Sequence, residues 1–487
     1  MTEIQGGTRR KRSLSGRISA GVLYVALTAP PFLFGSREPI FVAWWCVILG
    51  GGLIFAPTRR LLAGHLVVLA ILAFVALCFG FILHEQLSDH PWIADFNPIW
   101  ARASDALGKQ LVPSVSVVRG EPFFALGPSL ANALALVLGL LVGVDADRAR
   151  RAIRVMAWAG VGYAIYGILA LAFTPGAILW REKTAYLGSL TSTFINRNTA
   201  AAYFGSCAVV WLLLLMSAIR RILPRGPIEW KKALRRLVSK TRTRVLVRFV
   251  MLFVCLTAMF MTNSRGGTLV SLVVLVLTFL AYFWDDLPGG RGLFAVLVGC
   301  IVTALVVLQI IGGHVSDRLD VLGFADEGRL KTYRSTLKII FDHPWFGTGL
   351  GTFAAVFPGY RSGQGSMWGV WDMAHSTPLE FASEMGIPLT VIVGGAWIAA
   401  LVVMSLAVRG RQRGKVALLA SLAVSLIALV HSLIDFSLQI TGYSIVVFAL
   451  LGVGLSQAVN ERTGSGKSVS VNLDWRKSKS DIISKNR

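Results

Sequence analysis

Long apolar runs recur along the whole chain, and they constrain its fold more than any other feature of the sequence. Each has 17 or more residues, which as a helix is long enough to cross a hydrocarbon core of roughly 30 Å. Only 15% of the 487 residues are charged, whereas soluble domains carry about 25%. A membrane β-barrel would show short segments of alternating polarity instead. The sequence therefore predicts an all-α integral membrane protein with about twelve transmembrane helices.

The predicted spans are joined by shorter polar segments, with one long insertion between the ninth and the tenth. They cover residues 18–35, 39–56, 61–83, 123–144, 152–174, 198–218, 247–263, 267–284, 293–311, 386–408, 416–434 and 438–459. The chain then divides into a basic tail (1–17), nine helices (18–311), a large outer loop (312–385), three helices (386–460) and a second tail (461–487). The second tail is rich in Ser and Lys, which predicts disorder. The first apolar run lacks a clear cleavage site and is expected to stay as a helix.

The positive charges indicate how the helices are oriented. With the N-terminus inside, the inner segments hold 34 of the 48 Lys and Arg residues and the outer segments hold 14. Cytoplasmic loops carry such an excess. Both termini are therefore expected in the cytoplasm. The net charge of +23 is then a topology signal with some attraction to anionic lipid, and no nucleic acid partner is expected.

The metal-ligating residue types do not form a recognisable site. The five cysteines all lie within apolar runs and lack metal-ligand spacing, so they are interpreted as small buried side chains. Asp145 and Asp147 resemble the acidic triplet of sugar-nucleotide transferases. They precede a basic stretch at the inner face, however, and capping of the next helix explains them better. No metal and no cofactor are expected.

The middle of each predicted span is almost free of Asp, Glu, Lys and Arg. Ion-coupled transporters place ionisable groups or broken helices near the membrane midplane. Here the polar side chains gather at outer helix ends and outer loops. This distribution favours chemistry at the outer rim of the membrane over passage through it.

Two outer turns carry an arginine among small polar residues. Arg197 lies between Asn196 and Asn198, at the start of the sixth span, and Arg265 follows Ser264 in a short turn between the seventh and eighth spans. A guanidinium binds phosphate oxygens in pairs and stays charged at any working pH. Both turns are therefore candidate phosphate sites, although an arginine at a helix end can also extend its charge to the lipid headgroups.

The large outer loop contains a basic amphipathic segment and a candidate catalytic histidine. Arg329 and Arg334 lie in a predicted helix over 329–341 that suits a membrane surface. The glycine-rich turn 347–353 follows no strand and does not indicate a nucleotide fold. His375 precedes a predicted helix that contains Glu384. Histidine is the side chain best suited to accept a proton near neutral pH.

A second histidine lies at the outer turn between the last two spans. His431 and Asp435 are four residues apart, so one helix face can present both. We expect this pair to support the site by orienting its side chains.

Four patches in this order resemble the O-antigen ligase and O-antigen polymerase family of bacterial envelope enzymes. They are Thr193 to Asn198, Asn263 to Gly267, His343 to Gly351, and His375-Ser376 leading to Glu384-Met385-Gly386. The resemblance extends over about residues 180–440. It implies a C-type glycosyltransferase-like fold with a large periplasmic loop between helices 9 and 10.

The resemblance also implies a reaction at the periplasmic face of the inner membrane. Such enzymes take a glycan from undecaprenyl pyrophosphate, and a ligase passes it to the lipid A core of lipopolysaccharide. By this resemblance Arg197 and Arg265 match the donor pyrophosphate site and His375 the acceptor side. Arg329 and Arg334 are expected as further donor contacts. The expected supporting residues are Asn196, Asn198, Ser264, Glu384, His431 and Asp435.

Three other functions stay open at this point. A polymerase of the same family joins lipid-linked polysaccharide repeats and needs the same donor site. A non-enzymatic transporter such as a polysaccharide flippase lacks support because the spans hold so little charge. A scaffold leaves the outer arginines and histidines without a role.

Overall fold

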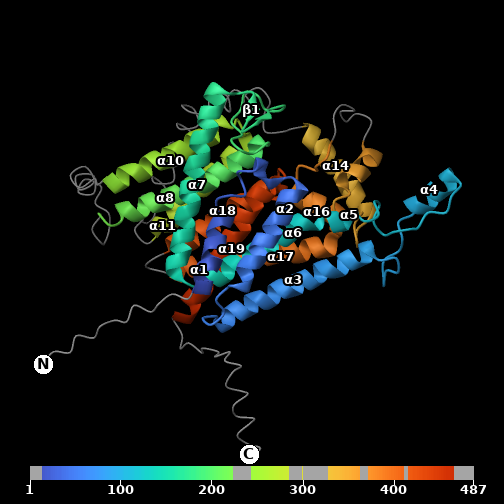
Figure 1. Cartoon of the computed structure of the whole chain (residues 1–487), viewed down its shortest axis with the longest axis horizontal. Coiled ribbons are helices and arrows are strands. Elements are labelled where there is room, and N and C mark those ends of the chain that lie inside the picture. The colour runs from blue at the N-terminus through green and yellow to red at the C-terminus, as the bar shows by residue number, and fades with distance from the viewer. Residues whose placement is uncertain are drawn as a thin grey trace, which may run out of the picture.

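The computed structural model describes residues 14–222, 243–284, 299, 327–361, 371–410 and 415–464. These residues form helices, short 3-10 turns and one small hairpin (Figure 1). The helices in the first half are α1 Leu14–Ala26, α2 Pro39–Ile54, α3 Ala63–Leu87, α4 Ile99–Leu107, α5 Glu121–Phe124, α6 Leu126–Gly143, α7 Ala146–Phe173 and α8 Arg197–Ile219. Those in the second half are α10 Thr243–Met261, α11 Arg265–Phe283, α14 Glu327–Asp342, α15 Phe353–Val356, α16 Thr377–Met385, α17 Ile387–Gly410, α18 Val416–Ser432 and α19 Thr441–Gly464. The hairpin pairs β1 Ala177–Ile178 with β2 Arg181–Glu182, and the 3-10 turns are Phe34–Ser36, Phe357–Tyr360 and Ser437–Gln439.

The apolar helices confirm an integral membrane protein. Within the described residues, eight helices are long and apolar enough to cross a membrane, and α1, α2 and α18 are shorter apolar helices. Each overlaps one predicted span. Except for residue 299, the predicted ninth span, 293–311, lies outside the described residues, as do the tails 1–13 and 465–487 and the start of the large loop.

The first span is shorter than its apolar run suggests. The sequence predicts 18–35, but α1 ends at Ala26, and the chain turns through a 3-10 segment at Phe34–Ser36. Pro30 and Pro31 account for the difference, because proline lacks the amide hydrogen that a continuing helix needs. The turn is held by Ser36, whose hydroxyl donates to the carbonyl of Pro30 at 2.7 Å.

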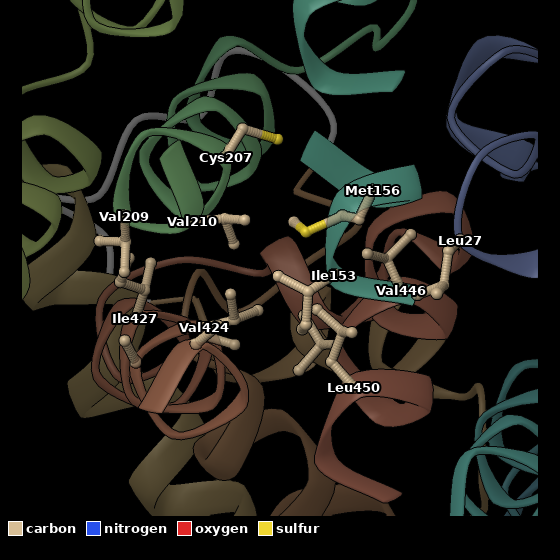
Figure 2. Close-up of a cluster of buried hydrophobic side chains, with 14 of the residues drawn as sticks. Leu27, Ile153, Met156, Cys207, Val209, Val210, Val424, Ile427, Val446 and Leu450 are labelled. Atoms are coloured by element: carbon tan, nitrogen blue, oxygen red, sulfur yellow. The ribbon is translucent and has the colours of Figure 1, made fainter. Parts of the chain in front are cut away.

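The core lies where α7, α8, α18 and α19 meet. Figure 2 shows Ile153 and Met156 of α7, Val210 of α8, Val424 of α18 and Leu450 of α19 gathered in one cluster of buried side chains. α19 is the most enclosed span, with 94% of its apolar window buried inside the protein. This explains why α19 lacks a polar face, since it borders other helices on all sides.

Glycines let α6 and α19 pack backbone against backbone. A methyl group at Gly139 would lie 2.1 Å from the carbonyl oxygen of Ala449, and one at Gly452 would lie 2.0 Å from that of Leu136. Small residues at such contacts allow two helix backbones to approach closely. This packing matters in a membrane, because lipid is as apolar as the helices and hydrophobic burial does not drive their association.

The bundle has two distinct ends. At one end, Gln457 and Asn460 of α19 donate to the carbonyls of Gly143 and Val144, and the start of α1 packs on Arg148. The described start of α1 and end of α19 therefore lie at the same end. The other end holds the first turns of α8 and α11 together with α14 and α16 (Figure 1).

Candidate functional site

The two arginine turns lie beside each other at the second end. Asn196 caps α8 by accepting from the amides of Asn198 and Thr199 at 2.6 and 3.2 Å. Ser264 caps α11 by accepting from the amide of Gly267 at 3.3 Å, and its hydroxyl donates to Asn198 Oδ1 at 2.8 Å. Arg197 and Arg265 are the first residues of these helices. Two helix N-termini, each with an arginine as its first residue, thus lie in one region, which favours an anion.

Arg197 is half-buried, and its side chain contacts the segment that precedes α8. Its Nη1 donates to the hydroxyl of Ser189 at 3.5 Å, and its guanidinium lies 5.1 Å from the ring centre of Tyr186. Asn263 also donates to Ser189, at 3.3 Å. A turn of the chain with φ +53° places Asn263 there. These contacts connect the Arg197 turn to the Arg265 turn.

Asp435 is the hub of the site, and its side chain is 1% exposed. Its Oδ2 accepts from Asn198 Nδ2 at 2.6 Å and from Arg329 Nη2 at 3.0 Å, and it lies 3.9 Å from His375 Nδ1. Burial alone would raise the pKa of Asp435, but His375, His431 and Arg329 hold it below its ordinary value. An ionised carboxylate therefore joins α8, α14 and the segment before α16.

His375 sits between two aromatic rings at the entrance of α16. The ring centres of Phe436 and Trp371 lie 4.9 and 5.6 Å from that of the imidazole, each edge-on. The backbone at His375 has φ +55°, and Tyr333 of α14 donates to its carbonyl at 2.9 Å. A left-handed conformation is uncommon for a residue with a side chain. The surroundings thus fix the imidazole beside Asp435.

The arginines of α14 take opposite faces of that helix. Arg329 points inward, since its Nη1 also donates to the carbonyl of Ile434 at 2.9 Å. Arg334 is exposed, on the face that carries Leu330, Leu337 and Phe341. The predicted helix is present as α14, but of its two candidate arginines the structure brings Arg329 and not Arg334 to Asp435.

His431 and Asp435 do not share a helix face, contrary to the expectation from their spacing. α18 ends at Ser432, so Asp435 lies in the turn beyond it. His431 Nδ1 instead pairs with the hydroxyl of Ser437 at 2.8 Å. Both side chains are buried, and His431 supports the turn that carries Asp435.

The glycine-rich turn and Glu384 together hold α16 in place. The amides of Thr348 and Gly349 donate to the carbonyls of Ser383 and Glu384 at 2.9 and 3.1 Å. The carboxylate of Glu384 accepts from the amide of Phe353 at 2.9 Å. Gln86 at the end of α3 donates to the carbonyl of Glu384 at 2.8 Å. Glu384 is therefore a structural residue some distance along α16 from His375.

Replacing Gly347 with alanine is expected to destabilise this turn. Its φ is +67°, and an added methyl group would lie 2.2 Å from the backbone carbon of Glu384. The left-handed backbone and the overpacking together cost about 2–6 kcal/mol, and the melting temperature in detergent should fall. Gly359→Ala is the matched control, because nothing lies within 4 Å of its added methyl. Equal melting temperatures for the two variants would contradict the close packing of this turn.

Glu380 holds the backbone next to His375. Its Oε2 accepts from the amide of Ala374 at 2.6 Å, and its side chain is buried. Burial raises the pKa of Glu380, and the carboxylate of Glu384 adds to the effect. The pKa of Glu384 is raised as well, mainly by burial.

The Glu380→Ala and Glu380→Gln variants separate this positioning role from a charge effect. Alanine leaves the amide of Ala374 without its partner, at a cost of about 1–3 kcal/mol, whereas glutamine keeps an accepting oxygen. We expect alanine to lower the melting temperature and glutamine to restore it at neutral pH. A carboxyl group whose pKa is raised by folding stabilises the folded state at low pH. This stabilisation is lost as the pH rises toward the raised pKa. Folding raises the pKa of Glu380 from 4.5 to about 8, so the melting temperature of the natural protein should fall more between about pH 4.5 and pH 8 than that of Glu380→Gln, and equal pH profiles would refute this role.

Several residues of the site have no marked signal in the sequence. Tyr186, Ser189 and Glu380 join it through contacts with residues 6 to 11 positions away in the chain, and Tyr333 through a contact with His375, 42 residues away. Asp435 has a signal in its spacing from His431, but its main partners are Asn198 and Arg329. Among the residues that the structure describes, no group of three or more His, Cys, Asp and Glu side chains is placed to hold a metal ion.

The fold and these side chains define a multi-pass membrane protein with a cationic site at one end of its helix bundle. Residues 250–394 match the family model described as O-antigen ligase, which confirms the resemblance seen in the sequence. The matched region contains Arg265, Arg329 and His375, while Arg197 and Asp435 lie outside it. No curated protein gives a significant match. The family implies a glycosyltransferase-type enzyme that acts on a lipid-linked glycan and an acceptor in a membrane.

Proposed function

We propose that this protein transfers a glycan from undecaprenyl pyrophosphate to an acceptor such as the lipid A core. The observation that carries the proposal is the link from the paired arginine turns to His375 through Asn198 and Asp435. This link supports a mechanism in which an anion-binding region and a candidate base act together. The family match supports the same reaction class.

The donor pyrophosphate binds at the N-termini of α8 and α11 in this proposal. Arg197 and Arg265 neutralise the charge that develops on the pyrophosphate as the glycosidic bond breaks. Charges that are fixed in advance, away from bulk water, stabilise a transition state most effectively. Arg329 adds a third guanidinium whose direction is set by Asp435. These arginines supply the positive charge, so the proposed reaction uses no metal.

The acceptor hydroxyl is activated by His375. The oxygen of the acceptor hydroxyl attacks the anomeric carbon of the donor glycan and forms the new glycosidic bond. The bond between that carbon and the pyrophosphate oxygen breaks, and its electron pair leaves with the pyrophosphate. His375 takes the hydroxyl proton. A carboxylate near Nδ1 favours the proton on that nitrogen and leaves Nε2 to act as the base. Direct displacement inverts the anomeric centre.

Arg265→Ala is expected to lower the rate of transfer by about 100-fold, since one donor to a developing oxyanion contributes that much. The measurement is glycan transfer by the purified full chain from a lipid-linked donor, with the KM for the donor determined as well. Arg334→Ala is the matched control, because this exposed arginine lies on the far face of α14. Full activity of Arg265→Ala would exclude the proposed donor site. A loss in Arg334→Ala as large as in Arg265→Ala would place Arg334 among the donor contacts.

A polymerase of lipid-linked repeats is the second candidate, because its reaction uses the same donor site. The lipid-linked glycans of a deletion strain separate the two. A strain that lacks a ligase accumulates long chains on the carrier, whereas one that lacks a polymerase accumulates single repeats. Single repeats would therefore reject the ligase assignment.

We also propose that the site faces the periplasm from the inner membrane, with both termini in the cytoplasm. The excess of Lys and Arg in the opposite segments supports this orientation. A cysteine at the exposed Lys109 should react with an impermeant maleimide from outside, and one at the exposed Arg59 should not. The reverse pattern would overturn the orientation.

A further inference from the structure

An open groove runs along α7 beside the end of α1, from Arg151 at one end to Leu179 and Thr193 at the other. Its volume is about 870 Å³, and its lining is mostly apolar. Trp158, Gly162 and Tyr163 form part of one wall. From Arg151 to Tyr166 the groove follows α7 for about 22 Å, at 1.5 Å per residue. Because half of a hydrocarbon core is about 15 Å thick, the groove is long enough for the chain of one leaflet.

One end of the groove is strongly basic. Arg151 and Arg154 line it and are exposed. Arg154 also belongs to a wider cluster, because it acts electrostatically on Arg248 of α10 together with Arg221 and Arg244. α7, α10 and the turn after α8 thus bring four arginines together at the end of the bundle opposite to the candidate site.

Among the residues that the structure describes, the carboxylates near this end of α7 pair with other arginines. Asp147 pairs with Arg150 at 2.6 Å, and Asp145 lies 3.9 Å from Arg60. The cluster around Arg154 therefore keeps an excess of positive charge where lipid headgroups lie. Basic pockets between membrane helices bind acidic headgroups. Trp158 lies one helical turn beyond Arg154 on α7, and tryptophan is typical of the membrane interface.

We propose that this groove binds one anionic glycerophospholipid from the leaflet opposite to the candidate site. The headgroup phosphate contacts Arg151 and Arg154, and one acyl chain lies along Trp158, Gly162 and Tyr163. The isoprenoid chain of a donor fits less well, because the groove approaches the candidate site only at its other end, at Leu179 and Thr193, and the donor's pyrophosphate would lie at that end. The basic end of the groove then has no anion to meet.

The test titrates palmitoyl-oleoyl phosphatidylglycerol onto the purified full chain in mild detergent and counts bound lipid by native mass spectrometry. Removing two basic residues beside a lipid phosphate should weaken binding by about 30-fold, so this loss is expected of the Arg151→Gln/Arg154→Gln double variant. The double variant Arg59→Gln/Arg409→Gln removes two exposed arginines outside the groove and should bind within about twofold of the natural protein. Phosphatidylcholine should bind to the natural protein as weakly as phosphatidylglycerol binds to Arg151→Gln/Arg154→Gln.

A second pair of variants tests the chain-binding part of the groove. Gly162 lines the groove, and nothing lies within 4 Å of an added methyl there, so Gly162→Leu fills the groove without displacing protein atoms. Gly80→Leu is the matched control on α3, with equally open space. We expect Gly162→Leu to weaken phosphatidylglycerol binding at least about fivefold and Gly80→Leu to leave it unchanged.

Three outcomes would overturn the proposal. In the first, phosphatidylcholine binds as tightly as phosphatidylglycerol. In the second, neither Arg151→Gln/Arg154→Gln nor Gly162→Leu changes binding. In the third, Gly162→Leu leaves phosphatidylglycerol binding intact but raises the KM for a lipid-linked donor, which would assign the groove to the isoprenoid chain.

Discussion

His375→Ala is expected to lower glycan transfer by about 100- to 10,000-fold, the range that a general base contributes. The loss should appear in kcat, because His375 acts on the acceptor proton in the transition state. The KM for the lipid-linked donor should change little, since the arginines that bind the pyrophosphate stay in place. The measurement is the steady-state rate of the purified protein over a range of donor concentrations.

His343→Ala is the matched control for this variant. His343 follows α14 in the same outer region, is half-buried and has no side-chain contact with the hub at Asp435. It should keep at least half of the natural rate. A kcat for His375→Ala within threefold of that for His343→Ala would remove His375 from the proposed mechanism.

Asp435→Ala is expected to reduce transfer by about 1,000-fold, because it disturbs three groups at once. Arg329 loses its buried partner, Asn198 loses an acceptor, and His375 loses the carboxylate that faces Nδ1. Removing one partner of a buried pair also destabilises a protein by about 3–5 kcal/mol. Both kcat and the KM for the donor should change, since Asp435 joins the donor and acceptor sides.

Asp435→Asn separates the charge of this residue from its shape. Asparagine fills the same space and can still accept from Asn198, but it does not neutralise Arg329. We expect a smaller fall in melting temperature than for Asp435→Ala and a transfer rate still reduced at least about 100-fold. Asp372→Asn is the control, because its exposed ion pair with Arg37 at 2.7 Å contributes little. Asp435→Asn activity as high as that of Asp372→Asn would show that the charge of Asp435 is not needed.

The helices of the fold were predictable because each follows from its own stretch of sequence. Apolar runs of sufficient length form helices in lipid, where every backbone group must find its partner within the segment. The turn at Asn263 and the cap at Asp145 were equally local, and the structure confirms them. The first span was predicted too long, since its apolar run continues through Pro30 and Pro31.

The two arginine turns were predictable for the same reason. Asn196 and Ser264 are good helix caps, and each stands directly before an arginine that then begins an apolar helix. The role of Asp435 was not predictable at this level. Its spacing from His431 suggested a shared helix face, yet α18 ends before Asp435 and its strongest partners lie 237 and 106 residues away in the chain.

The sequence by itself determined that this is a polytopic membrane protein, where its helices begin, and which stretches carry arginine and histidine. These properties depend on hydrophobic length, caps and local spacing. Only the tertiary structure decided that Asn198, Arg329 and His375 meet at Asp435, and that Arg334 is exposed on another face of α14. The physical reason is that one buried carboxylate, Asp435, needs several donors to offset its desolvation, and only the packing of distant helices brings them together.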